Sequence, residues 1–314
     1  MAIDPKKFGT IGVLMGGYSS EREISLRSGK AVAETLQQAG AAVKALDVQL
    51  QEPDAIRDFL RQARIDVAFI ALHGRLGEDG TIQAILQELR LPYTGSGVAA
   101  SRTAINKAAT QTLFKEQGIP VPELVIVNDK TEKHFFLNGH LKFPVVVKPA
   151  CEGSSIGVKI VHEKEELGVA LREAFGYGNE VLVERFIPGR ELTVGILGTK
   201  ALPVIEVIPK TKFFDFSAKY QSGETRYDIP ARISDRVAGN VQELALRAFH
   251  ALGCRHLSRV DVMLEDERDP YVLEINTIPG FTSTSLLPKA ARVIGLDFAQ
   301  LCLNIVEMAY GEKR

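Results

Sequence analysis

Short apolar runs alternate with amphipathic stretches along the first hundred residues of this 314-residue chain. Strands are predicted at the apolar runs 10–15, 43–48 and 67–72. Amphipathic spacing predicts helices at 53–63, at 81–89, and from a capping-box pattern at 20–23 to about Gly40. Strands that alternate with helices indicate a parallel sheet whose ligands bind at the carboxyl ends of the strands.

The pattern changes after a glycine-rich segment at 92–101. A helix is predicted at 101–117 because Gly118 and Pro120 follow it. Short β-rich runs then predict a small antiparallel sheet, with strands at 124–127, 144–148, 158–161, 181–184 and 192–197 and one helix at 164–175. The remainder predicts strands at 201–208, 259–264 and 271–276 and helices at 235–252 and 298–310. The expected fold class therefore combines α/β and α+β architecture.

Composition places the chain among folded, soluble proteins. Hydrophobic residues make up 45% and charged residues 25%, and the length suggests two or three domains. The 38 basic and 39 acidic side chains give a net charge of -1, without the basic surplus that binds nucleic acid. We therefore expect no nucleic-acid partner.

Cysteine usage and hydropathy indicate a cytoplasmic protein. Cys151, Cys254 and Cys302 lie far apart without CxxC spacing, so neither a disulfide framework nor a thiolate zinc site is expected. The longest apolar run, 67–72, is far too short to span a bilayer, and the first residues do not resemble a signal peptide. We expect no membrane segment, no export, and no chemistry from the Cys151 thiol.

Two acids and an amide lie on a predicted β-hairpin in the last quarter of the chain. Alternation puts Arg259 and Asp261 on one face of the first strand, and Glu274 and Asn276 on one face of the second. If the hairpin is symmetric about Glu267 and Arg268, Asp261 faces Glu274 and Arg259 faces Asn276. Opposed carboxylates repel unless a positive charge lies beside them, and oxygen donors favour magnesium over zinc. The alternative is that Arg259 alone neutralises the acids on an exposed face.

The segment FPVVVKPACEGSSIGVKIV at 143–161 predicts a strand, a glycine-serine loop and a second strand. Such a loop lets backbone N–H groups approach phosphates, and Lys148 would add positive charge. The chain lacks GxxxxGK[ST], so this is not a P-loop. GxSxG centred on Ser155 also suggests a serine hydrolase, but that nucleophile needs a following helix, whereas 158–161 predicts a strand. A purely structural hairpin turn is the third interpretation.

Weaker signals lie at four further places. The run 181–191 ends a strand in a Pro-Gly turn that could form a hinge beside an adenine, with Glu191 near the ribose hydroxyls. A hydrogen-bonded strand-end role is favoured for His73 over metal ligation. Glu21 either favours a helix dipole or binds an ammonium ion. GxGxxA at 95–100 suggests a dinucleotide site, but the full fingerprint is missing.

Seven segments, in order, make the chain resemble a known family. They are LMGGYSSERE, ALHGRLGEDG, KPACEGSSIGV, ERFIPGREL, AKY, RVDVML and LEINTIPGFTSTSLLP, and they run from residue 14 to residue 288. As a set they resemble the D-alanine:D-alanine ligases of the ATP-grasp fold. The resemblance implies that ATP phosphorylates the carboxylate of one D-alanine, and that the amine of a second attacks the acyl phosphate. The product would serve peptidoglycan synthesis.

The resemblance implies a nucleotide and metal site. Phosphate contacts are expected from Lys107, Lys148, Ser154 and Ser155, and adenosine contacts from Glu184, Phe186, Ile187, Glu191 and Met263. Two magnesium ions, replaceable by manganese, would be bound by Asp261, Glu274 and Asn276 and would offset charge on the transferred phosphoryl group. Phe186 stands where many relatives have tryptophan, so we expect altered nucleotide affinity only.

The same resemblance implies a site for D-alanine. Catalytic contacts are expected from Glu21, Ser154, Tyr220, Arg259 and the N–H of Gly280, and substrate contacts from Glu21, His73, Lys219, Ser285 and the N–H of Leu286. Glu21 would hold the ammonium group of the first D-alanine, while Arg259 and Gly280 would face the oxyanion. Tyr220, on a predicted lid at 210–228, favours an amine as the acceptor. A relative that uses D-lactate or D-serine as second substrate is the alternative.

Three domains follow from this resemblance. They are an N-terminal Rossmann-like substrate domain at 1–100, a central ATP-grasp domain at 101–187, and a C-terminal ATP-grasp and metal-binding domain at 188–314. The resemblance also implies a homodimer. Two hypotheses from other classes stay open: a serine hydrolase that uses Ser155, and a non-catalytic amino-acid-binding protein of similar layered architecture.

Overall fold

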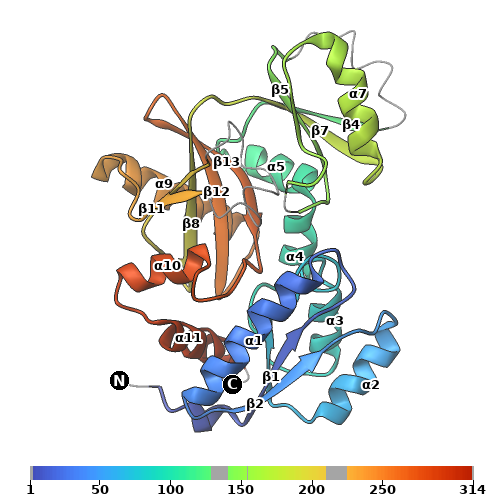
Figure 1. Cartoon of the computed structure of the whole chain (residues 1–314), viewed down its shortest axis with the longest axis vertical. Coiled ribbons are helices and arrows are strands. Elements are labelled where there is room, and N and C mark those ends of the chain that lie inside the picture. The colour runs from blue at the N-terminus through green and yellow to red at the C-terminus, as the bar shows by residue number, and fades with distance from the viewer. Residues whose placement is uncertain (1–2, 129–140, 154, 210–224, 313–314) are drawn as a thin grey trace.

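The computed structural model describes residues 3–128, 141–153, 155–209 and 225–312. Within these residues the chain forms three β-sheets, which follow one another along the sequence. Figure 1 shows the N-terminal sheet and the central sheet at opposite ends of the molecule, with two helices of the segment 98–116 running between them. One sheet falls within each predicted domain, whose exact boundaries stay a prediction. Of the expected site residues, Ser154, Lys219 and Tyr220 lie outside the described residues.

The N-terminal sheet is parallel, which confirms the prediction from alternating strands and helices. Its strand order is β2-β1-β3, and Tyr93 adds an isolated parallel bridge to Ala68. The strands are β1 (Thr10–Met15), β2 (Ala42–Asp47) and β3 (Val67–Ile70). The helices are α1 (Arg22–Gln38), α2 (Pro53–Ala63) and α3 (Thr81–Glu88), after a short 3-10 helix η1 (Pro5–Phe8).

The central sheet is antiparallel, as predicted, and its strand order is β4-β7-β5-β6. The strand expected in it at 192–197 is wrong, because this run forms part of β8 (Arg190–Leu197) in the C-terminal sheet. Its strands are β4 (Leu124–Asn128), β5 (Val145–Pro149), β6 (Lys159–Val161) and β7 (Glu180–Arg185). One face is covered by α7 (Lys164–Phe175), whose Leu167 and Leu171 are buried in the same hydrophobic cluster as Val147 and Val183. These side chains therefore fill the space between the sheet and one helix.

The single helix expected at 101–117 is wrong. The structure has α4 (Val98–Ile105) and α5 (Lys107–Glu116), separated by Asn106 in an extended conformation. The side chain of Asn106 accepts the N–H of Ala109 at 2.9 Å and so caps the second helix. The break was not predicted because the apolar pattern continues on both sides of Asn106. A cap depends on one side-chain oxygen, which hydrophobic periodicity does not report.

The C-terminal sheet has the order β11-β10-β8-β12-β13, with β9 paired to β8. Its strands are β8 (Arg190–Leu197), β9 (Lys200–Ala201), β10 (Ile205–Ile208), β11 (Arg226–Asp228), β12 (Leu257–Glu265) and β13 (Asp269–Asn276). Its helices are α9 (Asp235–Ala251), α10 (Leu286–Val293) and α11 (Phe298–Gly311). The strand predicted at 201–208 is split between Ala201 and Ile205, where Pro203 has no N–H for a ladder hydrogen bond.

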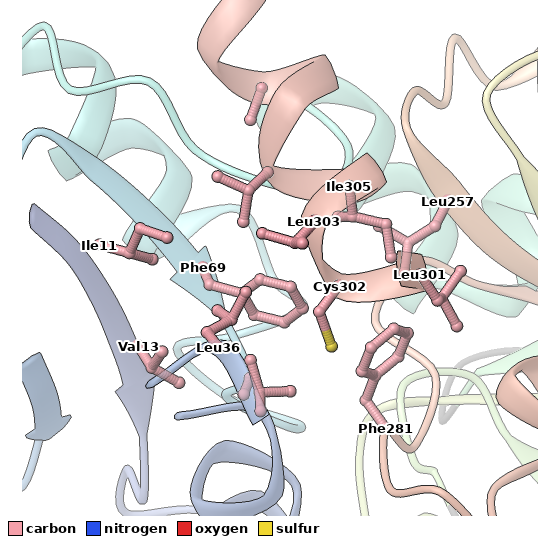
Figure 2. Close-up of a cluster of buried hydrophobic side chains, with 14 of the residues drawn as sticks. Ile11, Val13, Leu36, Phe69, Leu257, Phe281, Leu301, Cys302, Leu303 and Ile305 are labelled. Atoms are coloured by element: carbon pink, nitrogen blue, oxygen red, sulfur yellow. The ribbon is translucent and has the colours of Figure 1, made fainter. Parts of the chain in front are cut away.

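The last helix of the chain closes the core of the first sheet. Figure 2 shows Leu301, Cys302 and Ile305 of α11 beside Phe69 of β3 and Leu36 of α1. All of these side chains are buried, and Phe69 also packs on Phe281 with ring centroids 5.6 Å apart. The N-terminal and C-terminal parts of the chain therefore share one hydrophobic cluster instead of folding as separate cores.

Among the described residues, no single helix is long and apolar enough to cross a membrane. Only α10 and α11 taken together reach the required length and composition, and they are bent by 102° at the break between them.

Replacing Leu36 by alanine should test the shared cluster. Leu36 has no exposed surface, so truncation leaves a cavity and is expected to lower the free energy of unfolding by about 2–5 kcal/mol. Leu50→Ala is the matched control, because Leu50 is 37% exposed and should change stability by less than about 0.5 kcal/mol. Urea denaturation measures both values, and equal losses would contradict the burial difference.

Candidate active site

The hairpin of β12 and β13 brings the two predicted metal-binding carboxylates together. Asp261 pairs with Glu274 and Arg259 pairs with Asn276, so the predicted register of these residues is confirmed. The assumed centre between Glu267 and Arg268 is wrong, because Glu265 pairs with Asp269 and Val262 with Val272, which centres the turn on Glu267. An irregularity between Asp261 and Val262 leaves Leu273 as an extra residue and restores the predicted pairing beyond it.

Arg259 neutralises Asp261 directly. Its Nε and a terminal nitrogen donate to the two carboxylate oxygens of Asp261 at 2.8 and 2.7 Å. The buried Thr193 on β8 donates its hydroxyl to Asp261 at 2.6 Å, which fixes the carboxylate orientation from the other neighbouring strand. This contact matches the alternative interpretation from sequence for Asp261, and a cation bound there must share or displace the guanidinium.

The donor chemistry of this hairpin fits a hard divalent cation. Carboxylate and amide oxygens from Asp261, Glu274 and Asn276 are the ligand types that magnesium takes, and no sulfur or nitrogen ligand is among them. Among the described residues, no group of three or more His, Cys, Asp or Glu side chains is arranged to hold a metal ion. A magnesium ion held by two carboxylates and an amide completes its octahedron with water or with phosphate oxygens of a nucleotide.

A buried ion pair lies across the central sheet. Lys148 on β5 contacts Glu184 on β7 at 2.7 Å, and both side chains are almost fully buried. Gln111 of α5 donates to the same Glu184 carboxylate at 2.6 Å and to the carbonyl of Leu273 at 3.0 Å. A charge pair shielded from solvent needs such additional donors, so this network fixes the relative positions of β5, β7, α5 and β13.

A cavity of about 340 Å³ lies between the central and C-terminal sheets. Every described residue expected to contact the nucleotide lines it: Lys107, Lys148, Ser155, Glu184, Phe186, Ile187, Glu191 and Met263. Asp261 and Glu274 line it as well. The apolar walls include Val146, Ile208 and Leu273, as a planar aromatic base requires. We call this space the nucleotide cavity.

A second cavity of about 450 Å³ lies between the N-terminal and C-terminal sheets and is called the substrate cavity. The described residues expected to bind D-alanine line it: Glu21, His73, Arg259, Gly280, Ser285 and Leu286. Asn276 and Glu274 also reach it. Glu21 is held between two glycines, because a Cβ on Gly74 would lie 3.0 Å from its carboxylate and one on Gly153 3.5 Å.

The two cavities share part of their lining. Lys107, Glu152, Gly153 and Glu274 border both of them. Lys107 lies at the start of α5, donates to the carbonyl of Glu152, and contacts the carboxylate of Glu274 at 3.5 Å. A group that moves from one cavity to the other must therefore pass Lys107, Glu274 and the loop that contains Gly153. Enzymes that transfer phosphoryl groups use a lysine, an acidic metal ligand and a glycine-rich loop of this kind.

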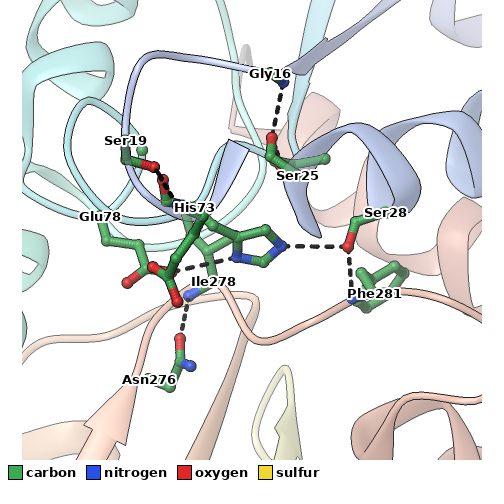
Figure 3. Close-up of polar contacts among 12 residues, drawn as sticks. Gly16, Ser19, Ser25, Ser28, His73, Glu78, Asn276, Ile278 and Phe281 are labelled. Carbon is green, nitrogen blue, oxygen red and sulfur yellow. Dashed lines mark hydrogen bonds and ion pairs between the residues drawn. The ribbon is translucent and has the colours of Figure 1, made fainter. Parts of the chain in front are cut away.

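His73 has both ring nitrogens engaged by neighbouring side chains, as Figure 3 shows. Ser28 of α1 lies 3.2 Å from Nε2, and Glu78 lies 3.4 Å from Nδ1. Burial raises the pKa of the Glu78 carboxyl, while the His73 hydrogen bond opposes the shift. The sequence-based view of a hydrogen-bonded strand-end histidine is confirmed, and its expected contact with D-alanine stays a prediction.

Several lining residues carried no assignment in the sequence. Glu152 directly precedes Gly153 in the glycine-serine loop, so its place in the sequence could have predicted that it lines the cavities. Ser28, Thr282 and Thr284 gave none, because their place in the substrate cavity depends on contacts between distant parts of the chain. Arg27 lines the same cavity. Glu21, Ile24 and Arg27 follow one another at intervals of three residues, which places them on the same side of α1.

The capping box predicted at 20–23 is wrong. Glu21 is the N-cap residue of α1, and its side chain makes no capping hydrogen bond. Ser19 instead accepts the N–H of Glu21 at 3.2 Å and donates to the carbonyl of His73 at 2.7 Å. The carboxylate of Glu21 is therefore directed to the substrate cavity and not to the helix end.

The loop after β5 does not form a nucleophile elbow. Residues after Ser155 continue into the strand β6 and not into a helix, as the sequence predicted. The exposed Cys151 lies in the same loop, and partial burial raises the pKa of its thiol. The reactive thiolate is thus disfavoured, in line with the absence of an assigned role.

Glu78→Gln should alter how stability depends on pH. Because the pKa of Glu78 is raised above 4.5, the folded protein holds this proton more tightly than the unfolded chain. The contribution of Glu78 to the free energy of unfolding therefore falls as the pH rises above 4.5. Relative to the unmodified protein, the variant should gain stability as the pH is raised above 4.5, measured by urea denaturation at a series of pH values. A difference that does not change with pH would contradict this.

Comparison with known proteins identifies the family. A model described as the D-ala D-ala ligase C-terminus matches residues 113–307, and one described as the D-ala D-ala ligase N-terminus matches residues 44–96. A D-alanine–D-alanine ligase of Syntrophotalea carbinolica is 47% identical over 300 residues, which cover 94% of each chain.

Solved structures agree with this result. The D-alanine–D-alanine ligase of Bacillus anthracis complexed with ATP has a TM-score of 0.85 and 33% identity, covering 97% of this chain and 98% of its own. The VanG D-Ala:D-Ser ligase of Enterococcus faecalis has a TM-score of 0.81 and 30% identity, covering 96% and 99%. The ATP-grasp fold and the family suggested by the sequence motifs are confirmed: this chain belongs to the D-alanine–D-alanine ligase family.

Proposed function

We propose that this chain joins two D-alanines into D-alanyl-D-alanine at the expense of ATP, for peptidoglycan precursors. The observation that carries the proposal is the shared lining of the two cavities. A nucleotide in one cavity and an amino acid in the other would meet beside Lys107, Glu152, Gly153 and Glu274. Family membership supports the same reaction.

The first step activates a carboxylate, which resists nucleophiles and has no good leaving group. The terminal phosphoryl group would pass from the nucleotide cavity to a carboxylate oxygen of the first D-alanine, and ADP would leave as the other product. Lys107 and Lys148 provide positive charge along this route, and Ser155 lies in the loop that covers it. Glu21 would hold the ammonium group of the same D-alanine from α1.

The second step joins the two amino acids. The amine of the second D-alanine would attack the acyl phosphate, and phosphate would leave. Arg259 and the N–H of Gly280 line the space where the oxyanion would form, and Ser285 with the N–H of Leu286 would receive the second carboxylate. Lys219 and Tyr220, expected to assist and to favour an amine acceptor, lie outside the described residues.

Asp261, Glu274 and Asn276 would hold magnesium beside the phosphates. Bound there, the metal would supply charge compensation for the transferred phosphoryl group. Arg259 makes a bidentate contact with Asp261 in this structure, so loading the site would free the guanidinium to face the substrate cavity. Manganese replacement, a homodimeric state and a cytoplasmic location remain predictions from the family resemblance.

Product identification by mass tests the reaction most directly. Purified protein incubated with ATP, magnesium and equimolar D-alanine, D-serine and D-lactate should form D-alanyl-D-alanine as the main product. Mixed dipeptide or depsipeptide as the main product would contradict the proposed acceptor. Binding of D-alanine without any ATP turnover would favour the non-catalytic alternative, and a serine-directed covalent label on Ser155 would favour the hydrolase.

Glu274→Gln should separate metal binding from folding. Removing one carboxylate from the hairpin is expected to lower turnover by at least about 100-fold and to weaken manganese binding measured by electron paramagnetic resonance. Glu243→Gln is the control, because it is the same substitution on the exposed surface of α9. Near-normal turnover and manganese affinity in Glu274→Gln at equal stability would count against the metal assignment.

A further inference from the structure

Ser28 connects two parts of the substrate cavity that come from distant regions of the chain. It lies on α1, has no exposed surface, and lines the cavity. Its hydroxyl oxygen accepts the N–H of Phe281 at 3.2 Å, across 253 positions of sequence. The same oxygen lies 3.2 Å from Nε2 of His73. Figure 3 marks this contact with a dashed line.

The proton count of these groups assigns the tautomer of His73. The assignment starts from the hydrogen bond between Nδ1 of His73 and the carboxylate of Glu78, where the carboxylate accepts and Nδ1 therefore carries the ring proton. Nε2 of the neutral ring is then unprotonated and can only accept. Ser28 accepts the N–H of Phe281 and gives its one hydroxyl proton to Nε2.

The other contact restrains the loop that carries Gly280. Phe281 N–H belongs to the peptide that joins Gly280 to Phe281, and glycine alone would leave that peptide free to rotate. The Phe281 ring is packed against Phe69 and Phe298, with centroids 5.6 and 5.5 Å away. Ser28 thus fixes the backbone of a residue whose side chain is already anchored.

We infer that Ser28 is a positioning residue for the ligase reaction. One hydroxyl holds the backbone beside the expected oxyanion donor Gly280 and sets the proton on His73, and it does so from the opposite side of the cavity. The inference rests on the proposed function for its kinetic consequence. The hydrogen-bond pattern itself, however, can be measured without any turnover.

Ser25 provides a matched control on the same helix. It is also fully buried, it lies one turn before Ser28, and its hydroxyl also makes two hydrogen bonds. It accepts the N–H of Gly16 at 2.8 Å and donates to the carbonyl of Ala71 at 2.7 Å. Both partners belong to the N-terminal sheet region, so Ser25→Ala removes comparable bonds without releasing Phe281 or His73.

The test compares Ser28→Ala, Ser25→Ala and Ser28→Thr with the unmodified protein. Ser28→Ala should lower kcat about tenfold or more with KM for ATP unchanged, because only groups beside the reacting carboxylate are displaced. Ser25→Ala should lose comparable thermal stability but keep kcat. Ser28→Thr, which restores the hydroxyl, should recover most of the lost turnover.

Two further measurements do not depend on activity. Nitrogen NMR of the His73 ring should show an unprotonated Nε2 in the unmodified protein and in Ser28→Thr, and a changed tautomer population in Ser28→Ala. Amide exchange at Phe281 should accelerate in Ser28→Ala only. Equal kcat losses in the Ser25 and Ser28 alanine variants, or a protonated Nε2 in the unmodified protein, would overturn the inference. If the unmodified protein makes no D-alanyl-D-alanine, the proposed function fails while these two measurements still decide the contacts.

Discussion

Asp261 and Glu274 face each other on neighbouring strands, and two carboxylates at that spacing repel unless positive charge lies beside them. Arg259 supplies that charge to Asp261 from the same strand, and Lys107 lies 3.5 Å from Glu274 at the start of α5. Each of these two acids is thus paired with a positively charged side chain before any ligand binds. The cations that accompany a nucleotide would therefore compete with Arg259 and Lys107 for these carboxylates. They would not bind to acids that lack a positive partner.

The parts around the hairpin follow from that requirement. The break at Asn106 lets α5 begin at Lys107, whose N–H donates to the carbonyl of Ala150 at 2.8 Å. The positive end of α5 consequently lies against the loop after β5, next to both cavities. Gln111, further along the same helix, donates to Glu184 and to the carbonyl of Leu273 on the hairpin. One capped helix therefore positions the phosphate loop, the buried ion pair and the irregular strand together.

Sequence patterns predicted the features that depend on local spacing. Alternation in β12 and β13 identified which side chains share a face, and alternating strands and helices predicted the parallel N-terminal sheet. The register of Asp261 and Glu274 was right although the assumed turn was wrong, because the extra residue Leu273 compensates for the tighter turn. The helix break at Asn106 escaped prediction, since it depends on a single side-chain hydrogen bond. The capping box expected at 20–23 is absent because the side chain of Glu21, the N-cap residue of α1, makes no capping hydrogen bond. The roles of the cavity residues rest on the family resemblance and not on spacing.

Contacts between distant segments could not be read from any pattern. Ser25 and Ser28 occupy one buried face of α1 and look equivalent in an amphipathic repeat. Ser25 bonds within the N-terminal region, whereas Ser28 reaches the backbone of Phe281, whose ring shares a hydrophobic cluster with α11. Because α11 closes the core of the first sheet, the same cluster that stabilises the fold also sets the distance between α1 and the loop of Gly280. The walls of the substrate cavity are therefore held by the core itself, and packing there controls how accurately the two halves of the site meet.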